Sequence, residues 1–406
     1  MITIKEAIEL IKKNLPERKE ELRKTYSCNH FTLAEDIYAQ FPSPYFDNCA
    51  MDGYAISIED AELLLSNFNQ NNEFEVIGIS QAGKPFTESL SSGKCIQINT
   101  GAKVPQNTGA IIPVEDVEYM DSDRLKIRVK NIHKKFQHIR RKGEEFQENS
   151  FLLPKGTILN PRNIALLLQS GKNEIFVYKK PKILLITTGT ELISFQDGII
   201  EEDMENGKIL DTNAYLLSAV LEDKNYEFKL YSQIQDEEGQ IYNILQNNND
   251  YDIIIITGGV SVGPYDYVKK DVEKAGFKPV FWKIKQKPGK PFYFAKKENT
   301  VLFGLPGNPV SSFINFQHYV LPAIKYLESG QWLYNHIFLK SKVDISNEGN
   351  RDIFFTIRIK DKEYFELAEQ QGSHKLSSIA YSDGYIIVPV GSKIQQNESL
   401  ICYQWM

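Results

Sequence analysis

Short apolar runs alternate with amphipathic stretches in the second half of the chain. Three runs are too short for helices and are rich in β-branched or aromatic residues, which is typical of buried parallel strands. These runs are Ile183–Ile186, Ile253–Ile256 and Val301–Phe303. Between them, residues 214–221 and 267–275 space their apolar side chains as helices do. The alternation predicts a central doubly wound, mostly parallel α/β sheet domain over residues 179–330.

The rest of the pattern predicts three further regions, so the expected fold class is multidomain α/β plus β. Short alternating segments separated by turns predict a β-rich inserted domain over residues 44–141. Strand-like runs at the end predict a small C-terminal β-barrel or sandwich over residues 331–406. Residues 1–43 together with 142–178 are then a discontinuous helical and β linker domain.

Two helices are expected within this linker domain. Apolar residues at Ile4, Ile8, Ile11 and Leu15 predict an amphipathic N-terminal helix, in a helical opening that extends to about Gln40. The apolar stretch that follows Asn160 predicts a second helix, which Asn160 would cap and Pro161 would begin.

Composition excludes several partners. The chain has 406 residues and a formal net charge of −6, so long-range electrostatics repel nucleic acid and anionic membranes. No apolar run approaches the roughly 18 residues that a membrane span needs. The four cysteines are scattered without metal-site or disulfide spacing. We therefore expect a reduced, cytoplasmic protein that binds neither nucleic acid nor membrane.

Three loops of small polar residues follow the predicted strands of the α/β domain: Thr187–Leu192, Thr257–Asp266 and Gly304–Ser312. In such sheets ligands bind beyond the carboxyl ends of the strands, and glycine-rich turns leave N–H groups free to face an anion. Asn308 and Pro309 suit a helix start. Each loop alone is also compatible with a plain turn, but three at one sheet edge favour a phosphate site.

Charged residues near these loops suggest what the site binds. The stretch Lys287-Pro288-Gly289-Lys290-Pro291 is a rigid turn that fixes where an ammonium group points, as recognition of an oxyanion requires. The carboxylates Glu191, Asp211 and Asp266 together could hold a hard cation or ribose hydroxyls. Separately, each is equally an ordinary solvated charge, and Asp211 also suits a helix cap.

The β-rich region carries two turn-like motifs, Asp47–Ala55 and Asn99–Pro105, which hairpins alone would explain. The basic cluster within residues 134–142 has only sparse aromatic interleaving, so a solvated face is the better interpretation than an RNA site.

Taken together, these motifs resemble the molybdopterin molybdenumtransferases of the bacterial MoeA type, a family that includes the C-terminal part of gephyrin. The resemblance spans nearly the whole chain and rests on eight motifs in the family's order. They are Asn48–Ala55, Asn99–Ala102, Arg140–Glu144, Thr188–Leu192, Asp211–Asn213, Gly258–Gly263 with Asp266, Lys287–Phe292 and Pro306–Ser311.

The resemblance implies an elongated four-domain homodimer in which the inserted domain of one subunit faces the α/β domain of the other. It implies that adenylylated molybdopterin and molybdate react, with Mg²⁺, to give molybdenum cofactor and AMP. A molybdopterin adenylyltransferase is then the expected upstream partner.

Site residues follow from the same resemblance. The expected catalytic residues are Asp52, Thr100 and Glu191, and Asp52 and Glu191 are also the expected metal ligands. The Gly258–Gly263 loop and Asp266 are expected to hold AMP, and Lys287, Lys290, Asn308 and Ser311 the phosphates or molybdate. The full expected substrate-binding set is Thr188, Gly189, Asp211, Gly258, Gly259, Ser261, Gly263, Asp266, Lys287, Lys290, Pro306, Gly307, Asn308, Pro309, Ser311, Arg351 and Ser373.

The chain departs from the family pattern at three positions. Glu145 stands where the family commonly has Asp, and Asn350 and Thr356 replace a Gly and an Arg around Arg351. His374, near Ser373, is expected to be exposed rather than catalytic. The sequence leaves open three alternatives: a molybdopterin adenylyltransferase, a non-catalytic molybdopterin-binding scaffold, and a nucleotide pyrophosphatase. It does not distinguish molybdate from tungstate.

Overall fold

The computed structural model describes residues 1–67, 72–259 and 267–406. Among these residues, no helix has both the length and the apolar character that a membrane span requires. The chain divides into two compact units, one made of Met1–Glu21 with Tyr178–Met406 and the other of Leu22–Val177.

A six-stranded sheet forms the centre of the first unit. Its order is β16 (Phe228–Ile234), β13 (Ile183–Thr188), β17 (Ile253–Thr257), β21 (Thr300–Leu305), β20 (Tyr293–Lys297) and β18 (Lys278–Trp282). The first four strands pair in parallel and the last two join antiparallel. The predicted mostly parallel sheet is confirmed.

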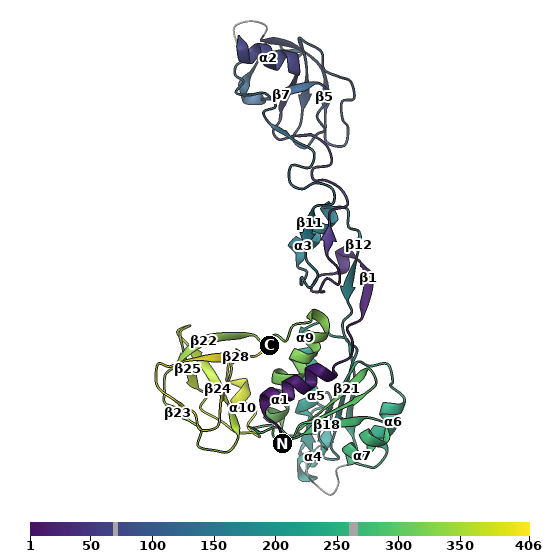
Figure 1. The fold of residues 1–406 in the computed structure, drawn as a ribbon, viewed down its shortest axis with the longest axis vertical. Coiled ribbons are helices and arrows are strands. Elements are labelled where there is room, and N and C mark those ends of the chain that lie inside the picture. Colours follow the sequence, from purple (N-terminus) through teal and green to yellow (C-terminus); the bar gives the residue numbers. More distant parts are fainter. Residues whose placement is uncertain (68–71, 260–266) are drawn as a thin grey trace. The chain divides into compact units, whose positions relative to one another are not determined.

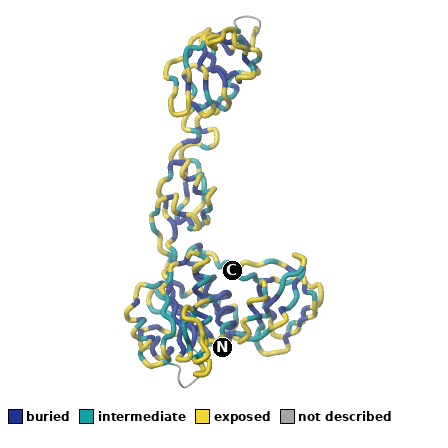
Figure 2. The backbone as a smooth tube through the Cα atoms, turned by 180° about the vertical axis from the view of Figure 1, so that it is seen from behind, coloured by how far each residue is buried: buried dark blue, intermediate teal, exposed yellow. Residues whose placement is uncertain are grey.

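Side chains alternate along these strands and enter two separate cores. Ile183 and Ile253 face one side, whereas Leu184 and Ile254 face the other. Figure 1 shows helices on both sides of the sheet. The first core is covered by α1 (Ile4–Asn14), α5 (Thr212–Asp223), α8 (Pro309–Asn315) and α9 (Leu321–Ser329), and the second by α6 (Gln240–Gln246) and α7 (Tyr267–Lys274). The sheet is therefore doubly wound, and its central strands β13, β17 and β21 are among the buried segments of Figure 2.

The N-terminal helix is shorter than expected, and it packs against a different domain than expected. It begins with a capping box between Thr3 and Glu6, and it ends at Asn14, two residues before Pro16, whose ring disfavours further helix. The expected helical opening to Gln40 is wrong, because strands β1 (Glu20–Lys24) and β2 (Ile37–Tyr38) and the 3₁₀ turn Thr25–Ser27 follow instead. Ala7 and Ile11 pack into the α/β core, so α1 lies with that domain and not with the linker.

The C-terminal region is a closed barrel and not a sandwich. Strand β24 (Asp352–Lys360) pairs with both β25 (Tyr364–Leu367) and β26 (Gly384–Val388), which closes the ring through β22 (His336–Ser341) and β28 (Ser399–Gln404). A short strand from the α/β region, β19 (Gln286–Lys287), adds in parallel to β24. This pairing joins the Lys287–Pro291 turn to the barrel.

Shorter elements complete the unit: α4 (Glu201–Glu205), α10 (Ser377–Ala380), and the pairs β14 (Leu192–Ile193) with β15 (Ile209–Leu210) and β23 (Ile345–Ser346) with β27 (Lys393–Ile394).

The second unit holds the predicted β-rich region. Its six-stranded sheet has the order β7 (Thr108–Pro113), β4 (Gly53–Ser57), β6 (Lys94–Ile98), β5 (Glu73–Ser80), β9 (Lys126–Val129) and β8 (Val117–Tyr119). The region is not purely β, since α2 (Ile58–Ser66) interrupts it. Ser57 explains the helix: its hydroxyl oxygen accepts a hydrogen bond from the Asp60 N–H at 3.1 Å.

The remaining part of this unit contains the second expected helix. It is α3 (Pro161–Gln169), and the Asn160 side chain accepts hydrogen bonds from the N–H groups of Arg162 and Asn163, as predicted. Short strands β12 (Glu174–Tyr178), β11 (Phe151–Leu153), β10 (Ile139–Arg140) and β3 (Asn48–Cys49) pair with β1, β2 and each other. Apart from α1, which packs with the α/β domain, the division into four domains at the expected boundaries remains a prediction.

Candidate functional site

The loops that follow the parallel strands meet at one edge of the α/β sheet, as predicted. A Cβ on Gly258 would lie 2.3 Å from the Thr188 carbonyl oxygen, so the loops after β13 and β17 touch closely and position 258 requires glycine. The Asn213 side chain, at the start of α5, donates a hydrogen bond to the Gly307 carbonyl at 2.8 Å. Gly307 lies between Pro306 and Asn308 in the loop after β21, so this edge assembles four of the predicted motifs.

Two buried oxygen atoms at this edge have no partner among the residues that the structure describes: Thr188 Oγ1 and Asn213 Oδ1. Gly259 lies against the first of them, because a Cβ there would approach Thr188 Oγ1 to 3.2 Å. Buried polar atoms are almost always hydrogen-bonded, so these two mark a place where the described residues leave hydrogen bonds unmade. The predicted residues Ser261, Gly263 and Asp266 lie outside the described residues.

Asp211 and Glu191 are neighbours beside these loops. Asp211 is 1% exposed, and its carboxylate accepts hydrogen bonds from the Thr187 hydroxyl and from the Ala214 N–H at 2.9 Å. Burial raises the pKa of the Asp211 carboxyl, and the nearby Glu191 charge acts in the same direction. Glu191 is exposed and lies over Gly189, where a Cβ would come within 2.9 Å of both its carboxylate oxygens. Asp211 thus acts as a helix cap, whereas Glu191 is free to face a ligand.

The expected metal ligands can be compared with this geometry. In the described part of the chain, no three His, Cys, Asp or Glu side chains gather as a metal-binding group. Mg²⁺, however, usually takes one or two carboxylates and completes its shell with water and substrate phosphates. Glu191, exposed at a strand end, fits such a ligand. Asp52 lies in the other unit, so the structure of a single chain does not test whether Asp52 and Glu191 bind the same metal ion.

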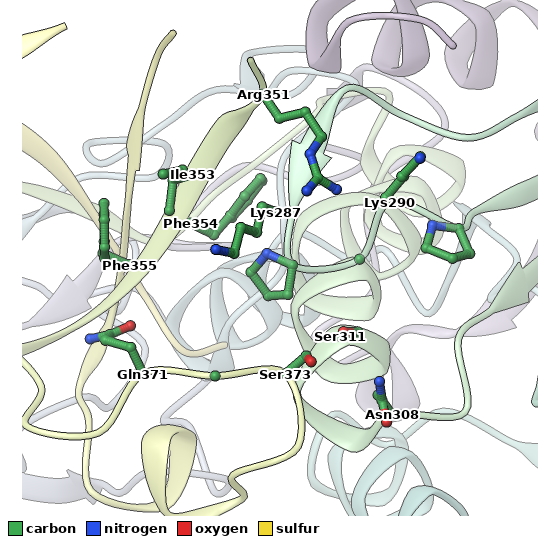
Figure 3. A pocket seen from close by; sticks show the side chains of 14 residues that line it. Lys287, Lys290, Asn308, Ser311, Arg351, Ile353, Phe354, Phe355, Gln371 and Ser373 are labelled. Atoms are coloured by element: carbon green, nitrogen blue, oxygen red, sulfur yellow. The ribbon is translucent and has the colours of Figure 1, made fainter. Parts of the chain in front are cut away.

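A cavity of about 470 Å³ lies between the Lys287–Pro291 turn and the barrel, and Figure 3 shows its lining. The turn forms one wall and β24 with the segment after β25 forms the other. Arg351, at the start of β24, extends toward the turn (Figure 3). The lining residues are Lys287, Pro288, Gly289, Lys290, Pro291, Asn308, Ser311, Arg351, Ile353, Phe354, Phe355, Gln371, Gly372 and Ser373.

The charged residues that line this cavity are all positive. Lys287, Lys290 and Arg351 contribute three cations, and none of the lining residues is acidic. Ser311, Ser373 and Asn308 add neutral hydrogen-bonding groups. We expected all six of these residues to bind substrate, and the structure brings all six to one cavity. A pocket with several cations and no carboxylate favours a small, multiply charged anion.

Asn308 differs from the sequence expectation in its role. It occupies the N-cap position of α8, and Pro309 follows at the first helical position, as predicted. Its side chain, however, makes no capping hydrogen bond. The amide is exposed and lines the cavity instead, so it remains available to a ligand.

Sequence reasoning missed Gln371. Its amide nitrogen donates to the Thr356 and Ala368 carbonyls at 2.9 and 3.0 Å, and its amide oxygen accepts from the Thr356 N–H and hydroxyl, both at 3.2 Å. The departure at Thr356 was the available signal, because a short hydroxyl side chain there makes room for an amide. Gln371 supports the wall of the cavity.

The β-rich unit carries the other predicted pair. One carboxylate oxygen of Asp52 accepts hydrogen bonds from the Thr100 N–H at 2.6 Å and from the Thr100 hydroxyl at 3.0 Å. These bonds lower the pKa of the Asp52 carboxyl. Both residues are exposed, so the pair forms a fixed negative group on the surface of the unit.

Comparison with known proteins decides the family. Residues 2–171 match the family described as "MoeA N-terminal region (domain I and II)", and residues 184–326 match "Probable molybdopterin binding domain". A molybdopterin molybdenumtransferase of Haemophilus influenzae is 32% identical over 397 residues, which cover 96% of this chain and 94% of the relative. The chain belongs to the molybdopterin molybdenumtransferase family. The predicted resemblance is thereby confirmed.

Two further proteins are similar to this chain over nearly all of their length. A molybdopterin molybdenumtransferase of Staphylococcus epidermidis is 30% identical over 401 residues, covering 97% of this chain and 92% of the relative. The crystal structure of a molybdopterin biosynthesis MoeA protein from Pyrococcus horikoshii matches with a TM-score of 0.83. It covers 100% of this chain and 99% of its own at 24% identity, so it shows the shared fold.

Two of the departures from the family pattern, Thr356 and Glu145, have structural partners. The Glu145 carboxylate accepts hydrogen bonds from the Ser43 hydroxyl and the Gln169 amide, both at 2.8 Å, so it links Ser43 to α3. His374 is exposed, as predicted.

Proposed function

We propose that the chain transfers molybdenum from molybdate to adenylylated molybdopterin and releases AMP. Membership of the molybdopterin molybdenumtransferase family supports this reaction. The observation that carries the proposal is the cavity with three cations and no acidic lining residue, because molybdate is a small dianion.

The cavity is proposed to hold the molybdate. Lys287, Lys290 and Arg351 would supply charge, and the Ser311 and Ser373 hydroxyls would supply neutral donors. Tungstate has the same charge and nearly the same size, so these groups would bind it as well. Ile353, Phe354 and Phe355 make part of the wall apolar, which lowers the local dielectric constant and strengthens each ion pair.

The strand-end edge of the sheet is proposed to hold the AMP part and the phosphoanhydride. Thr188 Oγ1 and Asn213 Oδ1 have no partner among the described residues, and in this proposal they would accept hydrogen bonds from a ligand hydroxyl or amine. Asn308 lines the cavity and directly follows Gly307 in the strand-end loop. The two subsites are thus adjacent along the chain, as a reaction between oxyanion and adenylylated substrate requires.

Asp52 and Thr100 are proposed to complete the site from the partner subunit of a homodimer. A fixed surface carboxylate on the β-rich unit fits a role in orienting substrate or in binding Mg²⁺ with Glu191. When bound, Mg²⁺ would neutralise charge on the phosphate oxygens. Thr100 would keep Asp52 ionised and oriented.

The adenylylation reaction is less well supported. The matched relatives are named for molybdenum transfer and are covered from end to end, β-rich region and barrel included. A separate adenylyltransferase is therefore the proposed source of substrate. We also propose a cytoplasmic location, since the four cysteines are free thiols, as is usual in a reducing compartment.

AMP release tests the proposal. Purified protein receives adenylylated molybdopterin and Mg²⁺, with and without molybdate. We expect AMP release that molybdate accelerates and that needs no ATP. Equal release with and without molybdate would indicate a pyrophosphatase, and tight binding without turnover would indicate a scaffold.

A further inference from the structure

A buried hydrogen-bond network lies behind the Lys287–Pro291 turn. It consists of the side chains of Gln286, Asn315 and Tyr319, each with 0% exposure. The Gln286 amide nitrogen donates to Asn315 Oδ1 at 2.8 Å, and the Tyr319 hydroxyl donates to Gln286 Oε1. None of the three lines the cavity, so none would touch a bound anion.

This network holds the backbone of the turn. The Asn315 amide nitrogen donates to the carbonyls of Gly289 at 3.2 Å and Pro291 at 3.4 Å. The Gln286 amide nitrogen donates to the Pro288 carbonyl at 3.1 Å. With the bond from the Ile284 N–H to the Lys290 carbonyl at 3.0 Å, all four carbonyls from 288 to 291 have donors.

The consequence is electrostatic as well as geometric. A carbonyl oxygen carries partial negative charge and repels an anion, but here each of the four carbonyls from Pro288 to Pro291 is engaged by a donor of the protein. The electrostatic potential in the cavity is therefore set by charged side chains, including the two lysines of the same turn. Buried networks of this kind fix one arrangement when every member is satisfied.

The turn and α8 also fit closely together. Gly289 has a φ of +79°, and a Cβ there would lie 2.6 Å from Asn315 Oδ1. Asn315 is on the helix that presents Ser311 to the cavity. The contact therefore fixes Lys287 and Lys290 relative to Ser311.

We propose that Gln286 and Asn315 are positioning residues of the anion cavity: they hold the Lys287–Pro291 turn so that both of its lysines stay in the lining of the cavity. The inference rests on the proposed function, since it assigns the cavity to molybdate. Loss of the network keeps both lysines but lets the turn that carries them adopt more conformations. It therefore weakens binding of the anion and leaves the rate of the chemical step nearly unchanged.

The test uses two kinds of change. Asn315→Thr keeps one hydroxyl donor, and the double variant Gln286→Met with Asn315→Leu replaces the two amides by apolar groups of similar size. The double variant leaves the Tyr319 hydroxyl and the carbonyls of Pro288, Gly289 and Pro291 without these partners, so we expect it to lower the free energy of unfolding as well, and Asn315→Thr is the milder second variant. Ser312→Ala is the matched control, because Ser312 is buried on α8 and its hydroxyl has no partner among the described residues.

Molybdate dissociation constants are measured by equilibrium dialysis, and KM for molybdate and kcat by AMP release. For the double variant we expect the dissociation constant and KM to rise about tenfold while kcat stays within about twofold, with a smaller rise for Asn315→Thr. Ser312→Ala should match the unmodified protein.

Three outcomes would overturn the inference. If the double variant has a lower melting temperature but unchanged molybdate affinity, the network is purely structural. If Lys290→Ala also leaves molybdate affinity unchanged, the cavity is not the molybdate site, and the proposed function fails there as well. Weakened binding in Lys290→Ala with normal binding in the double variant would reject the positioning role alone.

Discussion

Asp52 and Thr100 are 48 positions apart in sequence, yet one carboxylate oxygen of Asp52 accepts both the N–H and the hydroxyl hydrogen bond of Thr100. The antiparallel pairing of β4 with β6, with Gly53 opposite Ile98, brings them together. Because both bonds stabilise the ionised form, Asp52 is a carboxylate throughout the neutral pH range.

Asp52→Ala should reduce kcat for AMP release by about 100-fold, since it removes a fixed charge from the proposed site. The residue is exposed, so the variant should fold and melt as the unmodified protein does. Glu115→Ala, at an exposed carboxylate of the same unit, is the control and should keep full activity. Equal activity of all three proteins would remove Asp52 from the site.

A mixing experiment tests whether the site is shared between subunits. Asp52→Ala and Lys290→Ala proteins are each expected to be impaired. If one site uses Asp52 of one subunit and Lys290 of the other, random exchange into mixed dimers restores one intact site in half of the dimers. We then expect recovery of about one quarter of full activity after subunit exchange. No recovery, although exchange is confirmed by labelled subunits, would place both residues in the same subunit's site.

The sequence predicted the elements that have strong periodicity. The strands and helices of the α/β domain follow from apolar runs and helical spacing, and the gathering of Thr188, Gly258 and Gly307 follows from parallel topology. Pro16 was a signal for the early end of α1, and Ser57 for the start of α2. Pro16 and Ser57 both lie in short segments where a single residue decides the structure.

The cavity itself could be predicted only in part. Lys287, Lys290 and Arg351 were recognised from motifs, but their presence in the lining of one cavity depends on the pairing of β19 with β24, between residues more than 60 positions apart. Local patterns do not encode such a pairing. Gln286 and Asn315 gave no signal either, because a polar residue in a strand or helix is usually exposed.

Gly289→Ala should destabilise the protein by more than the strain of a positive φ alone. Gly391 has nearly the same φ, +76° against +79°, but no atom lies within 4 Å of its Cβ position, so Gly391→Ala measures the strain of about 1–2 kcal/mol alone. At Gly289 the new methyl group also meets Asn315 Oδ1 at 2.6 Å. Urea unfolding compares the two variants. Equal losses would mean that the turn is not packed tightly against α8.

His318 should make the protein less stable in acid. It is 1% exposed among aromatic rings, and its Nδ1 lies 2.9 Å from the Tyr385 hydroxyl. Burial lowers the pKa of His318 to about 3. Below a pH of about 6.5 the unfolded chain therefore binds a proton that the folded chain does not, and stability falls by about 1.4 kcal/mol per pH unit until the folded pKa is reached.

Urea unfolding between pH 7.5 and 5 measures this dependence. His318→Gln should flatten the pH dependence, whereas His374→Gln, at an exposed histidine, should leave it unchanged. An identical slope in His318→Gln would show that other groups cause the loss of stability.

The most direct test of the account is a molybdate titration of AMP release, with adenylylated molybdopterin saturating, for the unmodified protein, Lys290→Ala and Lys285→Ala. Lys285 is an exposed lysine next to the same turn but outside the cavity lining. We predict that AMP release rises to a plateau with molybdate and that Lys290→Ala raises the half-saturating concentration about tenfold, while Lys285→Ala leaves it unchanged. AMP release that is independent of molybdate, or a half-saturating concentration that Lys290→Ala does not change, would contradict the account.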